Sequence, residues 1–370
     1  MPLRVRTMPF RVRKAIMAGA LVSAGGLVLA SCASPGASAR DASDGPLVVA
    51  TTTQVGDFTR ELVGDSAEVT RLINPGQSTH SFDPSAAQLV ALAEADALVV
   101  NGAGLESWLD DAVAASGFDG VLIDASTGIE LFGTDDHDDH DHDHADEAHA
   151  DEAAHADEAA HADETPHADE APHAGHDHGA GNPHIWTDPH LAERMVENIS
   201  AGLATVPGLD SETIAVNEAD YLEKLAALDE WIHENIERVP AEQRLLVTNH
   251  DAFTYFLEAY DITFVGSVIP SFDDNAEPSA ADIDELVAKI RATGVQAVFS
   301  EASISPKAAE TIARDADVTV YAGDDALYGD SLGPEGSEGA TYLGSQAHNV
   351  RLFLESWGVE PSPLPAVLQG

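Results

Sequence analysis

The sequence predicts an α/β protein with two similar lobes, each a mainly parallel sheet flanked by helices, and one long rigid helix that joins them. Two series of short apolar segments alternate with segments of helical periodicity, which is the pattern of parallel strands joined by helical crossovers. A stretch without any strand signal separates the two series. We therefore expect a first lobe over residues 47–207, a linking helix over 208–240 and a second lobe over 241–370.

The first series begins at Leu47. Its predicted strands are LVVATTT (47–53), AEVTRLI (67–73), ALVVN (97–101) and GVLID (120–124), and its predicted helices are VGDFTRELVGD (55–65), PSAAQLVALAEA (84–95) and LESWLDDAVAAS (105–116). The separating stretch, from about Ser211 to Arg238, carries apolar residues at helical spacing and ends before Pro240. One long helix is a stiffer connection than paired hinge loops, so we expect limited movement between the lobes.

The second series has the same alternation. Its predicted strands are LLVTN (245–249), ITFVGSVI (262–269), QAVFSE (296–301) and VTVYA (318–322), and its predicted helices are DAFTYFLEAY (251–260), IDELVAKIRATG (283–294) and PKAAETIARDA (306–316). We expect a last helix from about Glu338 to Trp357.

The N-terminus has the order of an export signal: five basic residues, an apolar run over 15–30, and then Leu29-Ala30-Ser31-Cys32. It resembles a bacterial lipoprotein signal, in which this cysteine is lipidated and becomes the new N-terminus. We predict a signal peptide over 1–31, lipidation of Cys32 and a flexible tether over 32–46. The alternative is that Cys32, the only cysteine of the chain, is an incidental thiol.

The chain carries 65 acidic and 17 basic residues, a formal net charge of −48. Nucleic acid and anionic lipid surfaces are therefore poor partners, and cations are good ones. Because the acidity extends beyond any one segment, solubility or a salty habitat is an alternative reason for part of it.

Residues 135–181 form a low-complexity insert that holds eleven of the seventeen histidines: His137, His140, His142, His144, His149, His155, His161, His167, His173, His176 and His178. Five of them recur every six residues, a step that turns a helix by about 600° and does not keep side chains on one face. With few apolar residues, the insert is predicted to be disordered. We expect it to capture zinc or similar ions loosely, near a tighter site. The alternative is a neutral expansion of a repeat.

Four metal-capable residues lie far apart in the chain: His80 in STHSFDPS, His184 in NPHIWTDP, His250 in TNHDAFTYF and Asp330 in LYGDSLGPEG. Each has the context of a loop at a strand end or before a helix, where ligand sites of α/β proteins gather. Three imidazoles and one carboxylate suit a tetrahedral divalent metal, zinc above all. We predict one metal site in the cleft between the lobes.

Other polar residues have lesser predicted roles. Asp324 and Asp325 compete with Asp330 for the fourth ligand position, and Glu301 is a candidate to hydrogen-bond a ligand histidine. We expect Asp188 to cap a helix. His190 is expected beside the site or exposed, and His348 is expected to be structural.

The chain resembles the zinc or manganese solute-binding lipoproteins of bacterial metal ABC transporters, the cluster A-I family. The resemblance runs from about Leu47 to the end, interrupted by the insert, and includes the long helix and the closing GDSLG and SEGATYLGSQAHN. It implies that His80, His184, His250 and Asp330 bind the metal and that the insert is the His-rich loop of many members. Members that prefer manganese more often carry a carboxylate as the third ligand, so His250 favours zinc.

The expected function is therefore capture of Zn²⁺ and its delivery to a membrane permease, by a monomer that is lipid-anchored to the outer face of the cell membrane. Four protein ligands close the coordination shell, which suits transfer better than catalysis, and we expect no enzyme activity. The alternatives are a manganese-preferring member, a zinc-dependent hydrolase and a secreted metal buffer. The hydrolase has little support, because HENIE at 233–237 lacks the final histidine of HExxH.

Overall fold

The computed structural model describes residues 45–132 and 181–369. The predicted signal peptide and Cys32, all but the last two residues of the tether, and the insert with its eleven histidines lie outside these ranges; only Gly181 of the insert falls within them. Within these ranges, none of the helices combines the length and the hydrophobicity that a membrane span requires.

The first lobe contains a four-stranded parallel sheet in the order β2-β1-β3-β4. Its elements are β1 (Leu47–Ala50), α1 (Thr53–Val63), β2 (Glu68–Arg71), α2 (Ala86–Ala93), β3 (Ala97–Val100), α3 (Leu109–Ser116), β4 (Val121–Asp124) and α4 (Pro189–Leu203). Alternate residues of β1 pack on opposite faces: Val48 belongs to the core with α1 and α4, and Val49 to the core with α2 and α3. The central strands are buried on both faces, which explains their unbroken apolar sequence.

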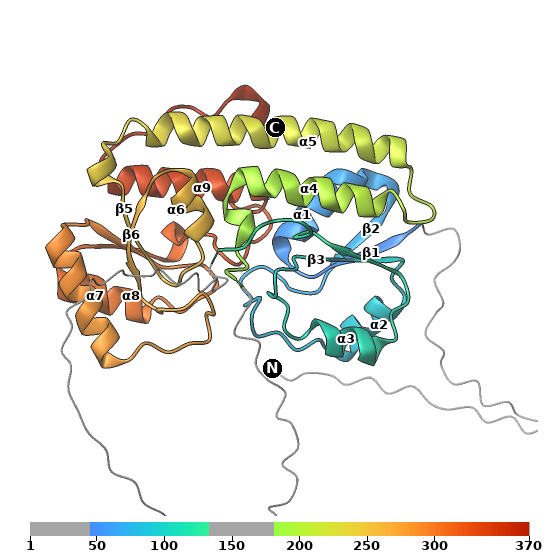
Figure 1. Ribbon diagram of the computed structural model, residues 1–370, viewed down its shortest axis with the longest axis horizontal. Helices are drawn as coiled ribbons and strands as arrows, with labels where there is room; N and C mark the ends of the chain where they lie inside the picture. Colours follow the sequence, from blue (N-terminus) through green and yellow to red (C-terminus); the bar gives the residue numbers. More distant parts are fainter. Residues whose placement is uncertain (1–44, 133–180, 370) are drawn as a thin grey trace, which may run out of the picture. The chain divides into compact units, whose positions relative to one another are not determined.

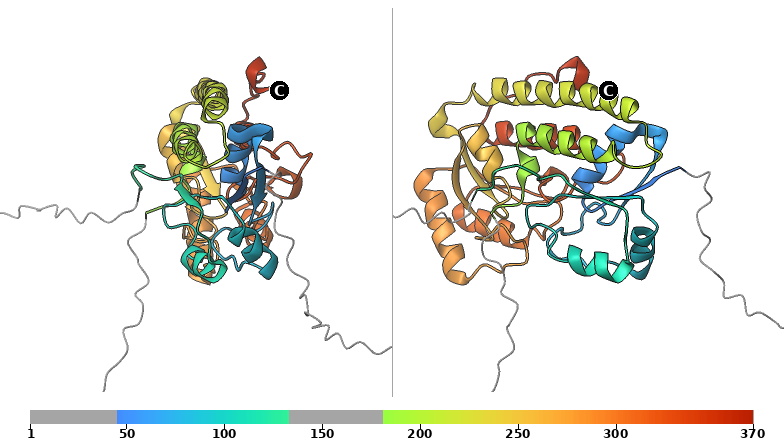
Figure 2. Two further views of the ribbon diagram at one scale, coloured as in Figure 1. Left: turned by 90° about the vertical axis from the view of Figure 1, so that its right-hand side faces the viewer. Right: turned by 45° about the vertical axis from the view of Figure 1, so that its right-hand side comes forward.

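The linking helix α5 (Ser211–Ile236) has 26 residues and is therefore about 39 Å long. It begins at the cap Asp210, whose side chain accepts a hydrogen bond from Glu212 N. It runs across both lobes and packs on α4, α1 and α9 (Tyr342–Ser356) (Figures 1 and 2). One continuous apolar core includes Phe58 of α1, Leu228 of α5 and Phe353 of α9, so the lobes share packing along this helical layer.

The second lobe holds two parallel strand pairs, β5-β6 and β7-β8, with β5 beside β7. Its elements are β5 (Leu245–Thr248), α6 (Thr254–Ala259), β6 (Thr263–Ser267), α7 (Ala280–Thr293), β7 (Ala297–Phe299), α8 (Lys307–Ala316), β8 (Thr319–Tyr321) and α9. Short 3₁₀ helices are η1 (Gly64–Ser66), η2 (Ile185–Thr187), η3 (Ala241–Gln243), η4 (Gly323–Asp325) and η5 (Ala366–Leu368). The predicted fold class, two α/β lobes joined by a long helix, is confirmed.

Several helices start later than predicted, and for α3 and α9 the structure shows a local cause. α3 begins at Leu109 because Glu106 turns back to accept hydrogen bonds from the backbone N–H groups of Asn101 and Gly102. α9 begins after Thr341, whose side chain accepts from Gly344 N and caps the helix.

Candidate metal centre

His80, His184, His250 and Asp330 come together at one point, with one potential ligand atom from each within 4.8 Å of all the others. The Nε2 atom of His184 lies 3.2 Å from that of His80 and 3.3 Å from that of His250. Oδ1 of Asp330 lies 3.0 Å from His184 Nε2 and 3.4 Å from His250 Nε2, and Oδ2 lies 3.5 Å from His80 Nε2. The four side chains could hold one small cation between them.

Parallel strands bring these distant residues to the same place. His80 lies in the loop between β2 and α2, His250 follows β5, and Asp330 lies in the loop after β8. His184 directly precedes η2 and α4. The carboxyl ends of parallel strands meet at one edge of their sheet, and loops from both lobes converge there.

The site is secluded from solvent. The side chains of His184, His250 and Asp330 are fully buried, and that of His80 is 8 % exposed. Beside His80 lies a small cavity of about 110 Å³, lined by Leu105 and Pro183 from the first lobe and by Phe272 and Asp273 from the second. His80 is thus the side chain of the four that lies nearest to solvent.

Hydrogen bonds determine which ring nitrogen of two histidines carries a proton. His184 Nδ1 lies 2.7 Å from Asn182 Oδ1, and His250 Nδ1 lies 2.7 Å from Glu301 Oε1. Both oxygens are acceptors, so the Nδ1 atoms carry the protons and donate them. In the neutral rings the Nε2 lone pairs therefore point at the common centre, as metal binding requires.

The Asp330 carboxylate is buried among the three histidines. Apart from the site histidines, neither carboxylate oxygen of Asp330 has a hydrogen-bond partner within the described ranges. Burial by itself raises the pKa of Asp330, but the positive charges of His250 and His184 outweigh it and hold that pKa well below its usual value. A buried, ionised carboxylate needs a positive partner.

The histidines differ in proton affinity. Burial lowers the pKa of His184 to about 4, so this ring is neutral at physiological pH. Burial also acts to lower the pKa of His250, but the negative charges of Glu301 and Asp330 outweigh it and hold that pKa well above its usual value. A proton therefore occupies His250 in the ion-free protein, at the position that a metal ion would take.

The other candidate residues lie outside the group of four. Asp324 and Asp325 lie in η4, outside the four-residue group, and Glu301 hydrogen-bonds His250. The side chain of Asp188 caps α4 by accepting from His190 N, and the His190 ring is 73 % exposed. His348 is buried on α9, where its Nε2 lies 3.1 Å from the carbonyl oxygen of Ala326.

Sequence reasoning missed several residues that hold the site together. Asn182 orients His184, and the NPH context two residues before the histidine was the available signal. Thr53, Gln54 and Trp186 contact the loop that carries Asp330. No local sequence pattern predicts these contacts, because they join segments more than 140 residues apart.

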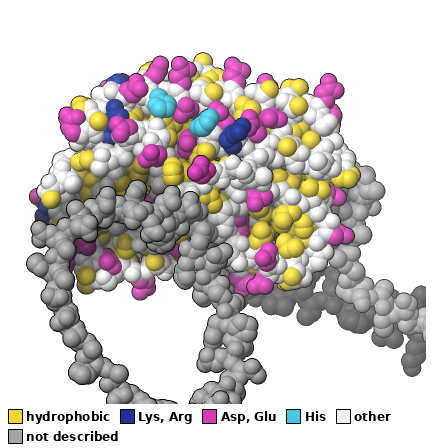
Figure 3. Space-filling model, viewed as in Figure 1, with side chains coloured by type: hydrophobic (Ala, Val, Ile, Leu, Met, Phe, Trp, Pro, Cys, Tyr) yellow, Lys and Arg dark blue, Asp and Glu magenta, His cyan; other side chains and the backbone are white. Residues whose placement is uncertain are grey.

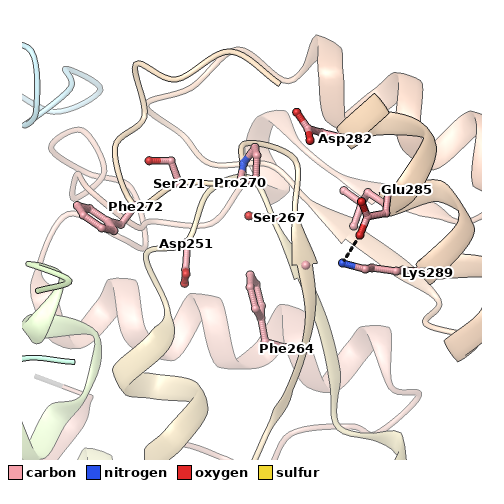
Figure 4. A pocket seen from close by; sticks show the side chains of 11 residues that line it. Asp251, Phe264, Ser267, Pro270, Ser271, Phe272, Asp282, Glu285 and Lys289 are labelled. Atoms are coloured by element: carbon pink, nitrogen blue, oxygen red, sulfur yellow. Dashed lines mark ion pairs between the residues drawn. The ribbon is translucent and has the colours of Figure 1, made fainter. Parts of the chain in front are cut away.

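Larger cavities than the one beside His80 lie elsewhere in the described part of the chain. One of about 480 Å³ lies between β6 and α7, and its lining includes Phe264, Asp251 and Asp282 (Figure 4). Its Lys289 and Glu285 are paired with each other at 3.0 Å, and its carboxylates lie apart rather than converging (Figure 4). This cavity does not have the chemistry of a metal site.

Acidic side chains are spread over the face of the molecule seen in Figure 3 and outnumber the basic ones there.

The chain is similar to proteins of bacterial metal uptake. It is 26 % identical to the manganese-binding lipoprotein MntA of Halalkalibacterium halodurans over 328 residues, 89 % of this chain and 94 % of that protein. It is 24 % identical to the manganese ABC transporter substrate-binding lipoprotein PsaA of Streptococcus pneumoniae over 330 residues, 87 % of this chain and 92 % of that protein.

Solved structures share the fold. The periplasmic zinc-binding protein TroA of Treponema pallidum superposes with a TM-score of 0.68 at 22 % identity, covering 85 % of this chain and 99 % of TroA. The family model for ZnuA, the periplasmic component A of zinc-uptake complexes, matches residues 48–356. The chain therefore belongs to the ZnuA family, the metal-binding solute-binding components of ABC transporters, and is not an enzyme.

Proposed function

We propose that this chain binds Zn²⁺ through His80, His184, His250 and Asp330 and delivers it to the permease of its ABC transporter. The observation that carries the proposal is the meeting of three imidazole Nε2 atoms, 3.2–3.3 Å apart in two of the pairs, with a fully buried carboxylate. All four groups face one point, and apart from these histidines the carboxylate has no hydrogen-bond partner within the described ranges. A divalent cation at their centre satisfies all four groups.

Zinc fits this donor set better than manganese. Zinc is commonly four-coordinate with imidazole and carboxylate ligands, whereas manganese is a harder ion that favours more oxygen donors. The site offers three nitrogens and one carboxylate, so nitrogen dominates. Manganese is the alternative, and it is favoured by the names of MntA and PsaA, which describe manganese proteins.

The N-terminus and the insert complete the proposal. A lipid on Cys32 would hold the protein at the outer face of the cell membrane, and the tether over 32–46 would let a monomer reach the permease. The eleven insert histidines would bind ions weakly and raise their concentration near the tighter site. These roles rest on the sequence, and the substrate-binding lipoproteins among the relatives support the anchor.

The test is a competitive titration of the protein lacking residues 1–31 with zinc and manganese, both with the insert and after deletion of 135–181. We expect one tight zinc equivalent that survives the deletion, weaker equivalents that are lost with the insert, and weaker binding of manganese at the tight site. Tighter binding of manganese would establish the alternative. Loss of the tight equivalent on deletion would move the main site to the insert.

Single alanine substitutions assign the ligands. Each substitution should weaken zinc binding at the tight site by at least about 100-fold, since each removes a direct ligand: His80→Ala, His184→Ala, His250→Ala and Asp330→Ala. The matched control is His190→Ala, which removes an exposed ring outside the site. A ligand variant that binds like the control would remove that residue from the site.

A further inference from the structure

We infer that Thr53 and Gln54, at the start of α1, are positioning residues that fix Asp330 for metal binding and so couple retention of the ion to contact between the lobes. The inference rests on the proposed function, because it requires Asp330 to be a ligand. It concerns a different part of the chain, since Thr53 and Gln54 belong to the first lobe and Asp330 to the second.

The two residues hold the backbone on both sides of Asp330. Gln54 Nε2 donates a hydrogen bond of 3.0 Å to the carbonyl oxygen of Gly329, and Leu332 N donates one of 2.9 Å to Thr53 Oγ1. The Thr53 hydroxyl in turn donates to Gln54 Oε1 at 2.9 Å, which orients the amide so that its nitrogen faces Gly329. We call these three hydrogen bonds the Thr53–Gln54 clamp.

The clamp is shielded from water. Thr53 is fully buried and Gln54 is 1 % exposed, so water does not replace a hydrogen bond that is lost. A buried polar group that loses its partner keeps the cost of its desolvation. The clamp therefore holds the backbone of the loop that carries Asp330 in one conformation while the lobes remain in contact.

The clamp matters for the carboxylate because the carboxylate has no fixing partner of its own. Within the described ranges, neither oxygen of Asp330 has a hydrogen-bond partner other than the site histidines. Metal ligands are usually oriented by hydrogen bonds from neighbouring groups, as Asn182 and Glu301 orient His184 and His250 here. For Asp330 the backbone of residues 329–332 must supply that orientation, and the clamp holds this backbone.

Two further contacts from the first lobe join the clamp. Trp186 Nε1 donates to the same Gly329 carbonyl at 3.1 Å, two residues after His184. Gly76 N, in the loop that carries His80, donates to Ser331 Oγ at 2.8 Å. The first lobe thus holds the loop of Asp330 with the segments that carry two of the histidines. Separation of the lobes would break these hydrogen bonds together and release the fourth ligand.

The test measures the rate at which zinc dissociates into excess chelator. Gln54→Met keeps the length of the side chain but removes the donor, and it should speed dissociation by about 10- to 100-fold, the usual effect of losing a group that orients a ligand. Thr53→Val, which removes the hydroxyl, should act in the same direction, and Thr53→Ser should restore slow dissociation. The matched control is Gln88→Met, whose amide donates to Leu72 O in the first lobe and does not contact the site.

A double-mutant cycle separates positioning from a general loss of stability. If Gln54 acts through Asp330, Gln54→Met should change dissociation less than about 2-fold in an Asp330→Asn background. An unchanged rate in Gln54→Met, or the same acceleration with and without Asp330, would overturn the inference. The Thr53→Ser and Thr53→Val pair gives the same decision if Gln54→Met does not fold.

The two proposals fail in different ways. If the wild-type protein lacks a tight zinc equivalent, or if Asp330→Asn leaves it unchanged, the proposed site is wrong and the clamp has no ligand to position. If Asp330→Asn weakens binding while the clamp variants release zinc at the wild-type rate, the site stands and the clamp alone is rejected.

Discussion

Glu301 Oε1 lies 2.7 Å from Nδ1 of His250, and both side chains are fully buried. The opposite nitrogen of the same ring faces Asp330 at 3.4 Å. His250 is therefore held between two carboxylates, one that orients the ring and one that would share the metal with it. This arrangement makes His250 a point at which protons and metal compete.

Zinc binding should release protons at neutral pH. The pKa of His250 is raised well above 6.5, so the ring is charged at pH 7 in the ion-free protein and must lose a proton to bind metal. His184, with a pKa of about 4, releases none there. Affinity should fall as the pH drops below the raised pKa of His250. Calorimetry in buffers of different ionisation enthalpy should give about one proton or more per zinc, and zero would contradict this assignment.

Replacement of Glu301 should move the pH dependence. Glu301→Gln keeps an oxygen that accepts from His250 Nδ1 but removes the negative charge that raises the pKa of His250. That pKa should fall, and the pH at which zinc affinity is half lost should fall with it. Glu301→Ala removes the hydrogen-bond acceptor as well and should weaken zinc binding by about 10- to 100-fold. Zinc titrations from pH 5.5 to 8.5 distinguish the two variants. A Glu301→Gln profile that coincides with the wild-type profile would show that the charge has no role.

The cavity beside His80 should control the rates at which zinc enters and leaves the site. Ser78 Oγ donates a hydrogen bond of 2.9 Å to Asp274 Oδ1, which joins the loop of His80 to the second lobe. Ser78→Ala removes this partly exposed hydrogen bond, worth about 1 kcal/mol, and the two longer ones of 3.3 Å that Ser78 Oγ accepts from the backbone N–H groups of His80 and Ser81. Loss of the link between the lobes should speed both uptake and release by about fivefold. Because both rates change together, the dissociation constant should change little. Stopped-flow measurement of the two rates checks this, with Ser116→Ala on α3 as a control. A change in release alone would place Ser78 in the binding site.

Much of this architecture could be predicted from the sequence. The alternation of apolar strands with helical segments predicted the fold class. Loop contexts predicted the four residues that converge, His80, His184, His250 and Asp330. The partners that orient them could not be read in the same way. Asn182 is adjacent to its histidine, but Gln54 and Gly329 are 275 residues apart, and only the packed lobes bring them together. Hydrogen bonds between distant loops leave no periodic signal in a sequence.

The stability of the protein should depend on Asp57, a buried carboxylate of α1. Its Oδ2 accepts a hydrogen bond of 2.8 Å from Tyr342 N at the start of α9. Burial raises the pKa of Asp57 to about 6, and the Tyr342 hydrogen bond offsets only part of this effect. Since the pKa in the unfolded chain is near 3.8, ionisation of Asp57 costs the folded state free energy. The cost is absent below about pH 4, grows between pH 4 and 6 and is complete above pH 6.

Asp57→Asn should therefore stabilise the metal-free protein at pH 7, by up to about 3 kcal/mol, because an amide oxygen still accepts from Tyr342 N and carries no charge. Urea unfolding at pH 4 and pH 7 measures the difference between variant and wild type at each pH. The gain should be large at pH 7 and small at pH 4, where wild-type Asp57 is already mostly protonated. The exposed substitution Asp119→Asn is the matched control and should show neither effect. An equal gain at both pH values would mean that the benefit comes from packing and not from removal of the buried charge.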